Sequence, residues 1–110
     1  DGIELPWGVC NGKFTVSENI ADNGGMAVTL DIMSHSEGVS FEEYFTNWAR
    51  VWCQKAKPEY QKLLLQVDVH GPAYLRCNMP PRNFPEWYAT FGVKKSDEMY
   101  LAPSKRVVVW

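Results

Sequence analysis

The chain has 110 residues, of which 45% are hydrophobic and 14% aromatic, and its formal net charge is −2. This apolar and aromatic content excludes disorder for the chain as a whole, and the length suits one domain at most. The slightly acidic balance argues against nucleic acid as a partner. No apolar run in the sequence is long enough to cross a membrane.

Three cysteines occur, and none belongs to a Cys-x-x-Cys motif. An odd number cannot pair completely within one chain, and the wide spacing gives no zinc knuckle. We therefore interpret Cys10, Cys53 and Cys77 as small, partly buried residues of a protein kept in a reducing compartment.

The first 14 residues are rich in glycine, which predicts an irregular lead-in with a tight turn at Asn11-Gly12. Thr15-x-x-Glu18 then has the form of a capping box, in which two side chains satisfy free backbone N–H groups at the start of a helix. We therefore predict a helix over residues 15–36.

Two adjacent glycines, Gly24 and Gly25, fall inside this predicted helix. Each glycine costs about 1 kcal/mol relative to alanine in a helix interior. The pair should therefore have a structural reason. We expect either that the helix ends there or that another backbone packs very close.

Ser40-x-x-Glu43 is a second capping-box pattern, followed by aromatic and small apolar residues at spacings of three and four. It predicts a helix over residues 41–57 with one aromatic face. That face fits a ligand-stacking wall, but a buried core face is the simpler interpretation. Pro58 suits the first turn of a third helix, over residues 58–66. The aromatic face consists of Phe41, Tyr44, Phe45, Trp48, Ala49 and Trp52.

The remaining residues, 67–110, carry several prolines and are predicted to be rich in loops. Pro85 can start a short helix over Glu86–Phe91, which Gly92 would end in the left-handed conformation. The last four residues are expected to form either a short strand or an extended arm. The chain is thus predicted to be mainly α-helical, with aromatic faces left to contact a partner outside it.

Glu18 and Asp22 are the sharpest candidates for chemistry, because residues four apart lie on one face of a helix. Two interpretations stay open from this spacing alone. The pair either serves a metal or a reaction, or consists of acids favoured near the positive end of the helix. His35 and His70, taken singly, would be ordinary solvated histidines.

Four blocks stand out along the chain: ENIADNGG at residues 18–25, YFTNWARVW at 44–52, VHGPAYLR at 69–76, and a closing stretch that ends in VW. In this order they resemble segments of the neprilysin / endothelin-converting-enzyme family of zinc metalloendopeptidases. The resemblance implies that residues 1–110 form a single piece. It would be the helical C-terminal part of a thermolysin-like (gluzincin) catalytic domain.

The resemblance implies roles for five residues. Glu18 matches a protein ligand of the catalytic zinc, and Asp22 matches the acid that holds a zinc-ligating histidine by its other ring nitrogen. His70 matches the residue that hydrogen-bonds the developing oxyanion, and Arg76 matches an arginine that binds substrate near the zinc. Asn78 is assigned to the substrate-binding turn, although this chain lacks the glycine that commonly follows it in the family.

The HExxH motif of the family, which supplies two zinc ligands and the general base, is absent from these 110 residues. Catalytic zinc needs three protein ligands, so Glu18 alone cannot complete the site. We therefore expect the chain, which begins at Asp1, to be part of a longer endopeptidase that cleaves oligopeptides, and to be inactive alone. Its partners would be the remainder of the catalytic domain and the peptide, and its exposed aromatic faces would favour self-association.

Members of the family outside the cell often carry a cysteine where this chain has Val107, which favours a bacterial, cytoplasmic member. Two other functions stay open. One is a non-catalytic helical interaction module derived from the same fold. An HExxH motif in the sequence upstream of Asp1 would favour the peptidase over this module. The other is a cysteine hydrolase using Cys77 and His70, which is disfavoured because no orienting acid is evident.

Overall fold

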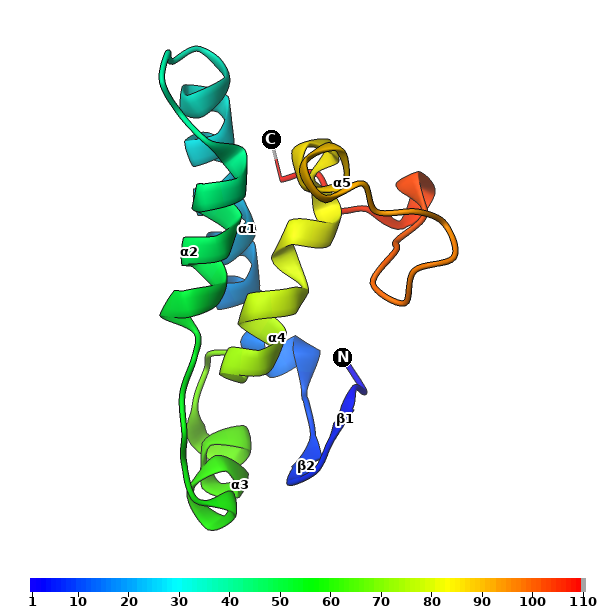
Figure 1. The fold of residues 1–110 in the computed structure, drawn as a ribbon. Helices are drawn as coiled ribbons and strands as arrows, with labels where there is room; N and C mark the ends of the chain where they lie inside the picture. The colour runs from blue at the N-terminus through cyan, green and yellow to red at the C-terminus, as the bar shows by residue number, and fades with distance from the viewer. Residues whose placement is uncertain (110) are drawn as a thin grey trace.

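The computed structural model describes residues 1–109, which form five α-helices, two short 3-10 helices and one two-stranded sheet. The described chain is elongated, with principal extents of 44 × 27 × 25 Å. The long helix α1 (Gly12–Ser34) lies beside α2 (Phe41–Val51), and the chain then turns through α3 (Pro58–Val67) before it returns along this pair (Figure 1). The prediction of a mainly helical chain is confirmed. None of the helices within residues 1–109 is both long and apolar enough to cross a membrane.

The lead-in is not irregular, as the sequence suggested, but contains a small antiparallel hairpin. Its strands are β1 (Glu4–Leu5) and β2 (Gly8–Val9), with Glu4 opposite Val9. The hairpin lies against α3, and a Cβ atom on Gly8 would come within 3.0 Å of the Leu65 side chain. Gly8 also has a φ of 143°, so only glycine suits this position.

The first residue of α1 is Gly12, and the predicted start at the Thr15 capping box is wrong. The N-cap is Asn11, whose side-chain oxygen accepts a hydrogen bond from the backbone N–H of Phe14 at 3.1 Å. Asn is among the strongest N-cap residues, and Asp1 further accepts from the N–H of Gly12 at 2.8 Å. Thr15 is instead buried inside the first turns.

Helix α1 continues through Gly24 and Gly25, so the expectation that it ends there is wrong. The 3-10 helix η1 (Pro80–Asn83) packs against α1, and Asn83 donates a hydrogen bond to the side-chain oxygen of Asn23 at 2.7 Å. Gly24 is buried, whereas a Cβ atom on Gly25 would meet nothing within 4 Å. Helix η1 thus packs on α1 at the neighbouring Asn23, and the expected close backbone approach at the glycine pair stays a prediction.

Helix α2 begins as predicted, with the Ser40 hydroxyl accepting from the N–H of Glu43 at 3.2 Å. It ends at Val51 and not near residue 57. The residue before a proline avoids the helical conformation, and Lys57 is extended with ψ of 143°. The link after α2 places α3 (Pro58–Val67) against the hairpin, and the predicted start at Pro58 is confirmed.

The proline-rich stretch after His70 is more ordered than predicted. Helix α4 (Ala73–Asn78) follows Pro72, and η1 begins at Pro80. Proline fits the start of a helix because the N–H it lacks would have no partner there. The same residues that suggested a loop therefore begin two helical turns.

The end of the chain largely follows the prediction. Helix α5 (Pro85–Phe91) ends at Gly92, which has the expected left-handed conformation with φ of 61°. A 3-10 helix, η2 (Pro103–Lys105), occurs in the polar tail. Residues 107–109 form no strand, and Trp110 lies outside the described residues.

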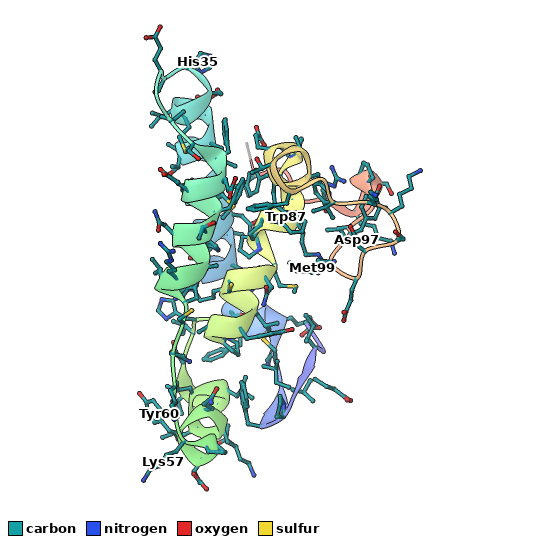
Figure 2. All side chains as sticks on the ribbon, in the orientation of Figure 1. His35, Lys57, Tyr60, Trp87, Asp97 and Met99 are labelled. Carbon is teal, nitrogen blue, oxygen red and sulfur yellow. The ribbon has the colours of Figure 1, made fainter. Side chains whose placement is uncertain are left out.

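The core forms where α1 meets α2. Met26, Leu30 and Phe45 are 0%, 2% and 4% exposed. Burying an apolar side chain of this size contributes about 1.5–3 kcal/mol, so these three residues fix the helix pair. Partly buried aromatic residues from α2, α5 and the turn before α5 complete the cluster, namely Phe41, Tyr44, Trp48, Phe84 and Trp87. Figure 2 labels Trp87, which belongs to α5.

Candidate active site

Helix α1 presents Glu18 and Asp22 on one face, as their spacing predicted. The Glu18 side chain is 38% exposed, while that of Asp22 is 13% exposed. The segment that follows α3 carries His70 and Arg76. The His70 ring contacts the Glu18 carboxylate, and the Arg76 guanidinium contacts the Asp22 carboxylate. Four of the five residues singled out in the sequence are therefore together in the folded chain.

His70 lies between two carboxylates. Its Nε2 is 3.2 Å from Oε2 of Glu18, and its Nδ1 is 2.8 Å from Oδ1 of Asp68. Imidazole can donate to both oxygens only when both ring nitrogens carry a proton. The side chain is 41% exposed, so a molecule in solution can reach it.

Asp68 positions this histidine from two residues upstream. Its Oδ1 accepts the backbone N–H of His70 at 2.9 Å as well as the ring contact. The backbone N–H of His70, and then its side chain, hold the pKa of the Asp68 carboxyl below its usual value. Backbone and imidazole are thus fixed by one carboxylate oxygen.

Arg76 is held from two sides. Its Nε and Nη2 donate to the two oxygens of Asp22, both at 2.7 Å, and its guanidinium carbon lies 4.0 Å from the ring centroid of Trp52. The hydrogen bond to Asp22 raises the pKa of Arg76, so the group stays charged. Paired N–H donors and a stacked face are the geometry for which arginine, unlike lysine, is suited.

A cavity of about 150 Å³ opens beside these groups. His70, Arg76 and Asp68 contribute polar atoms to its lining, and Trp52 and Leu64 contribute apolar surface. A few directed polar groups on an apolar wall are typical of small ligand sites. The arrangement can therefore orient a polar group beside an apolar one.

The described residues supply fewer protein ligands than a catalytic zinc ion needs. No group of three or more His, Cys, Asp or Glu residues within 1–109 could hold a metal ion. Glu18 is accessible and offers carboxylate oxygens, which zinc accepts, so it fits as one ligand of a larger set.

Comparison with known proteins identifies the family. The model of "Peptidase family M13" matches residues 2–107. The chain belongs to this family. The M13 chain is 47% identical over 110 residues to the neutral endopeptidase of Lactococcus lactis, and 32% identical over 113 residues to human neprilysin. These matches cover 100% and 91% of this chain, but only 18% and 15% of the two relatives.

A solved structure agrees with the sequence comparison. The crystal structure of PEPO from Lactobacillus rhamnosis HN001 superposes on 97% of the M13 chain with a TM-score of 0.86 and 43% sequence identity. The match uses 17% of the PEPO chain. The described helices therefore reproduce a helical part of the PEPO chain, which is several times longer.

Two polar residues considered in the sequence form no hydrogen bond or ion pair with the cluster within residues 1–109. Asn78 donates its side-chain N–H to the carbonyl of Tyr74 at 2.8 Å. His35 lies at the end of α1 away from the hairpin, 79% exposed, with Nδ1 2.9 Å from the carbonyl of Asp31 (Figure 2). The interpretation of His35 as a solvated residue agrees with this position.

Cys77 has the wrong environment for a hydrolase nucleophile. Burial raises the pKa of its thiol, whereas an activated cysteine has a lowered pKa. The hypothesis of a cysteine hydrolase is therefore abandoned for this M13 chain.

Neither Asp68 nor the contact of Trp52 with Arg76 was among the site residues predicted from the sequence. Asp68 carried a signal, because Asp often bonds its own backbone two residues on, and here the second residue is His70. Trp52 belonged to the aromatic face of α2, for which a buried core was the simpler interpretation and a ligand-stacking wall the alternative, and nothing there indicated Arg76 as its partner.

Proposed function

We propose that the M13 chain is the C-terminal part of the catalytic domain of a zinc endopeptidase that cleaves oligopeptides, and that it is inactive alone. The observation that supports this best is the convergence of Glu18 and Asp22 from α1 with His70 and Arg76 from a segment about fifty residues later. The chain spans less than a fifth of the relatives it matches, so the proposal concerns the full-length protein.

Glu18 would supply one of the zinc ligands. The other two, and the general base, would come from an HExxH motif in the remainder of the catalytic domain. When bound, zinc lowers the pKa of a coordinated water and polarises the peptide carbonyl. Both oxygens of Asp22 accept hydrogen bonds from Arg76. Because a carboxylate offers about four acceptor sites, Asp22 can also accept the N–H of a zinc-ligating histidine from the remainder of the catalytic domain.

His70 would stabilise the charge that develops on the peptide oxygen. Asp68 holds its Nδ1 and backbone, which leaves Nε2 directed toward Glu18 and the exposed side of the cluster. A donor already in place acts on the transition state without reorganising. Removing one such donor typically costs about 100- to 1,000-fold in kcat.

Arg76 would bind the peptide backbone. Asp22 takes two of its five N–H donors, so the others remain for a substrate carbonyl, and the Trp52 ring keeps the guanidinium in one plane. Asn78 would contribute its side-chain oxygen to the same substrate, since its N–H is already bonded to Tyr74.

The remainder of the catalytic domain would cover the outer face of α1. Val16, Ile20, Val28 and Ile32 of this helix are 48–60% exposed. Several exposed apolar side chains on one helix are typical of a surface that meets other protein. We also propose a bacterial, cytoplasmic location, supported by the bacterial relatives and by Val107 in place of the cysteine of extracellular members.

Zinc retention in the full-length protein tests the assignment of Glu18. Glu18→Val should lose the metal, whereas Glu37→Val, in the exposed turn after α1, should keep one equivalent. Metal content measured after gel filtration decides between them. A Glu18→Val protein that keeps a full equivalent would contradict the proposal.

Steady-state kinetics test His70. His70→Gln should lower kcat by about 100- to 1,000-fold and leave KM nearly unchanged, because the hydrogen bond forms only in the transition state. An unchanged kcat would exclude this role. A full-length protein that binds no zinc and cleaves no peptide would support the non-catalytic interaction module instead.

A further inference from the structure

Two amide side chains lie along α1 directly after the acids of the candidate site. Asn19 follows Glu18, and its side chain donates to the hydroxyl of Thr15 at 3.0 Å. Asn23 follows Asp22, and its side chain donates to the backbone carbonyl of Asn19 at 2.8 Å. The two amides therefore bond to α1 itself at successive turns, beside each of the two acids.

Asn23 also ties α1 to a distant part of the chain. The side-chain N–H of Asn83 donates to Oδ1 of Asn23 at 2.7 Å. Oδ1 of Asn83 in turn accepts the backbone N–H of Val107 at 2.9 Å. Asn83 is the last residue of η1, which packs against α1. One amide thus bonds α1 with its donor end and the C-terminal arm, residues 107–109, with its acceptor end.

The tied residue lies where α1 is intrinsically weakest. Gly24 and Gly25 follow Asn23 directly, and glycine is among the least favourable residues in a helix interior because it loses the most conformational freedom there. Asn23 also faces the same side as the neighbouring acid, since Asn23, Asp22 and Arg76 all line one cavity of about 240 Å³. The bond from Asn83 to Asn23 therefore acts on the turn of α1 that carries Asp22.

We propose that Asn83 is a positioning residue of the zinc site, which holds the Asp22 turn of α1 through Asn23 and makes the C-terminal arm part of that support. The inference rests on the proposed function, because it concerns the metal that Glu18 would help to bind. Groups that orient metal ligands typically contribute 10- to 100-fold to metal affinity. We expect about tenfold from Asn83, the lower end of this range, because it acts through α1 and not on a ligand directly.

The zinc affinity of the full-length protein tests this role. Asn83→Asp keeps the side-chain shape and an acceptor for the N–H of Val107, but puts an oxygen in place of the donor to Asn23. If Asn23 turns its amide to compensate, it gives up its bond to the Asn19 carbonyl. The Kd for zinc, measured by competition with a chelator, should rise about tenfold. Asn47→Asp, the same change at an exposed position of α2, should leave this Kd unchanged.

Two further measurements separate positioning from a general loss of stability. Ser40→Ala removes the N-cap of α2 and so destabilises the protein without changing the bonds of Asn83, and its zinc Kd should equal that of wild type. Hydrogen exchange of the zinc-free protein reports on the arm independently of the metal. Asn83→Ala removes the acceptor of the Val107 N–H, so this amide should exchange at least tenfold faster than in wild type.

The outcomes distinguish this inference from the proposed function. If wild type binds zinc and Asn83→Asp loses no more affinity than Ser40→Ala, the positioning role is overturned while the proposed function stands. If wild type binds no zinc, the proposed function fails and the positioning role fails with it. Unchanged exchange of the Val107 amide in Asn83→Ala would show that Asn83 does not hold the arm, and would overturn that part of the proposal.

Discussion

Arg76 and Asp22, 54 residues apart in sequence, are joined by two parallel hydrogen bonds of 2.7 Å. The pair connects α4 to α1, and the two side chains are 20% and 13% exposed. Their partial burial limits screening by solvent, and the Trp52 ring covers one face of the guanidinium. The contact is therefore a structural link between the two segments that carry the candidate site, as well as a part of that site.

Breaking this pair should destabilise the fold. Arg76→Met leaves the Asp22 carboxylate partly buried without its partner, and we expect a loss of about 2–4 kcal/mol in the free energy of unfolding. Urea unfolding measures the change. Arg50→Met is the matched control, because Arg50 is exposed and, among residues 1–109, its side chain donates only to Asn47 of the same helix; it should cost less than about 0.5 kcal/mol.

A double-mutant cycle separates the pair from the loss of arginine packing. Asp22→Asn combined with Arg76→Met should cost less than the sum of the single changes, because each single change already removes the interaction. Additive costs would show that the two side chains contribute independently, contrary to the geometry.

The lowered pKa of Asp68 predicts a dependence of stability on pH. A carboxyl with a folded-state pKa below its unfolded value stabilises the protein above the unfolded pKa, near 4, and the contribution is lost as pH falls through the folded pKa. Asp68→Asn should thus be less stable than wild type at pH 6, and the difference should shrink below pH 4. Urea midpoints of both proteins across this range measure it, with the exposed Asp31→Asn as control. A difference that stays constant with pH would contradict the predicted linkage.

The elements that the sequence predicted correctly depend on local chemistry. Ser40 starts α2, Pro58 starts α3, and Gly92 ends α5. The capping oxygen of Ser40, the fixed φ of Pro58 and the missing Cβ atom of Gly92 each act within a few residues, so the neighbouring sequence reveals them. The i, i+4 pair of Glu18 and Asp22 is equally local. The elements that were missed depend on distant contacts.

The early end of α2 and the presence of α4 show this dependence. Trp52, the C-cap of α2, contacts Arg76 of α4, and Trp48 donates a hydrogen bond to the carbonyl of Arg76. Neither partner is visible from the neighbouring sequence. The pairing of His70 with Glu18 likewise needed the resemblance to a family, since a single loop histidine carries no signal of its own.

The start of α1 offers a direct test of cap choice, since the sequence pattern favoured Thr15 and the structure has Asn11. Asn11→Ala should lower the free energy of unfolding by about 1 kcal/mol, because it removes the acceptor of the Phe14 N–H. Ser17→Ala, exposed on the same helix, should cost less than about 0.5 kcal/mol. Equal stability of Asn11→Ala and wild type in urea unfolding would place the helix start elsewhere.

The outer face of α1 predicts how the chain behaves without its neighbours. Ile20 and Ile32 of α1 are 49% and 60% exposed, so the isolated 110 residues should self-associate as concentration rises. The double change Ile20→Glu, Ile32→Glu should restore a monomer in sedimentation velocity, while Lys13→Glu on the same helix should not. In the full-length protein the same double change should lower Tm, because the remainder of the catalytic domain would cover both positions. The prediction is contradicted if the isolated wild-type chain stays monomeric at high concentration and the double change leaves the Tm of the full-length protein unchanged. This face would then be exposed to solvent in the isolated chain and in the full-length protein.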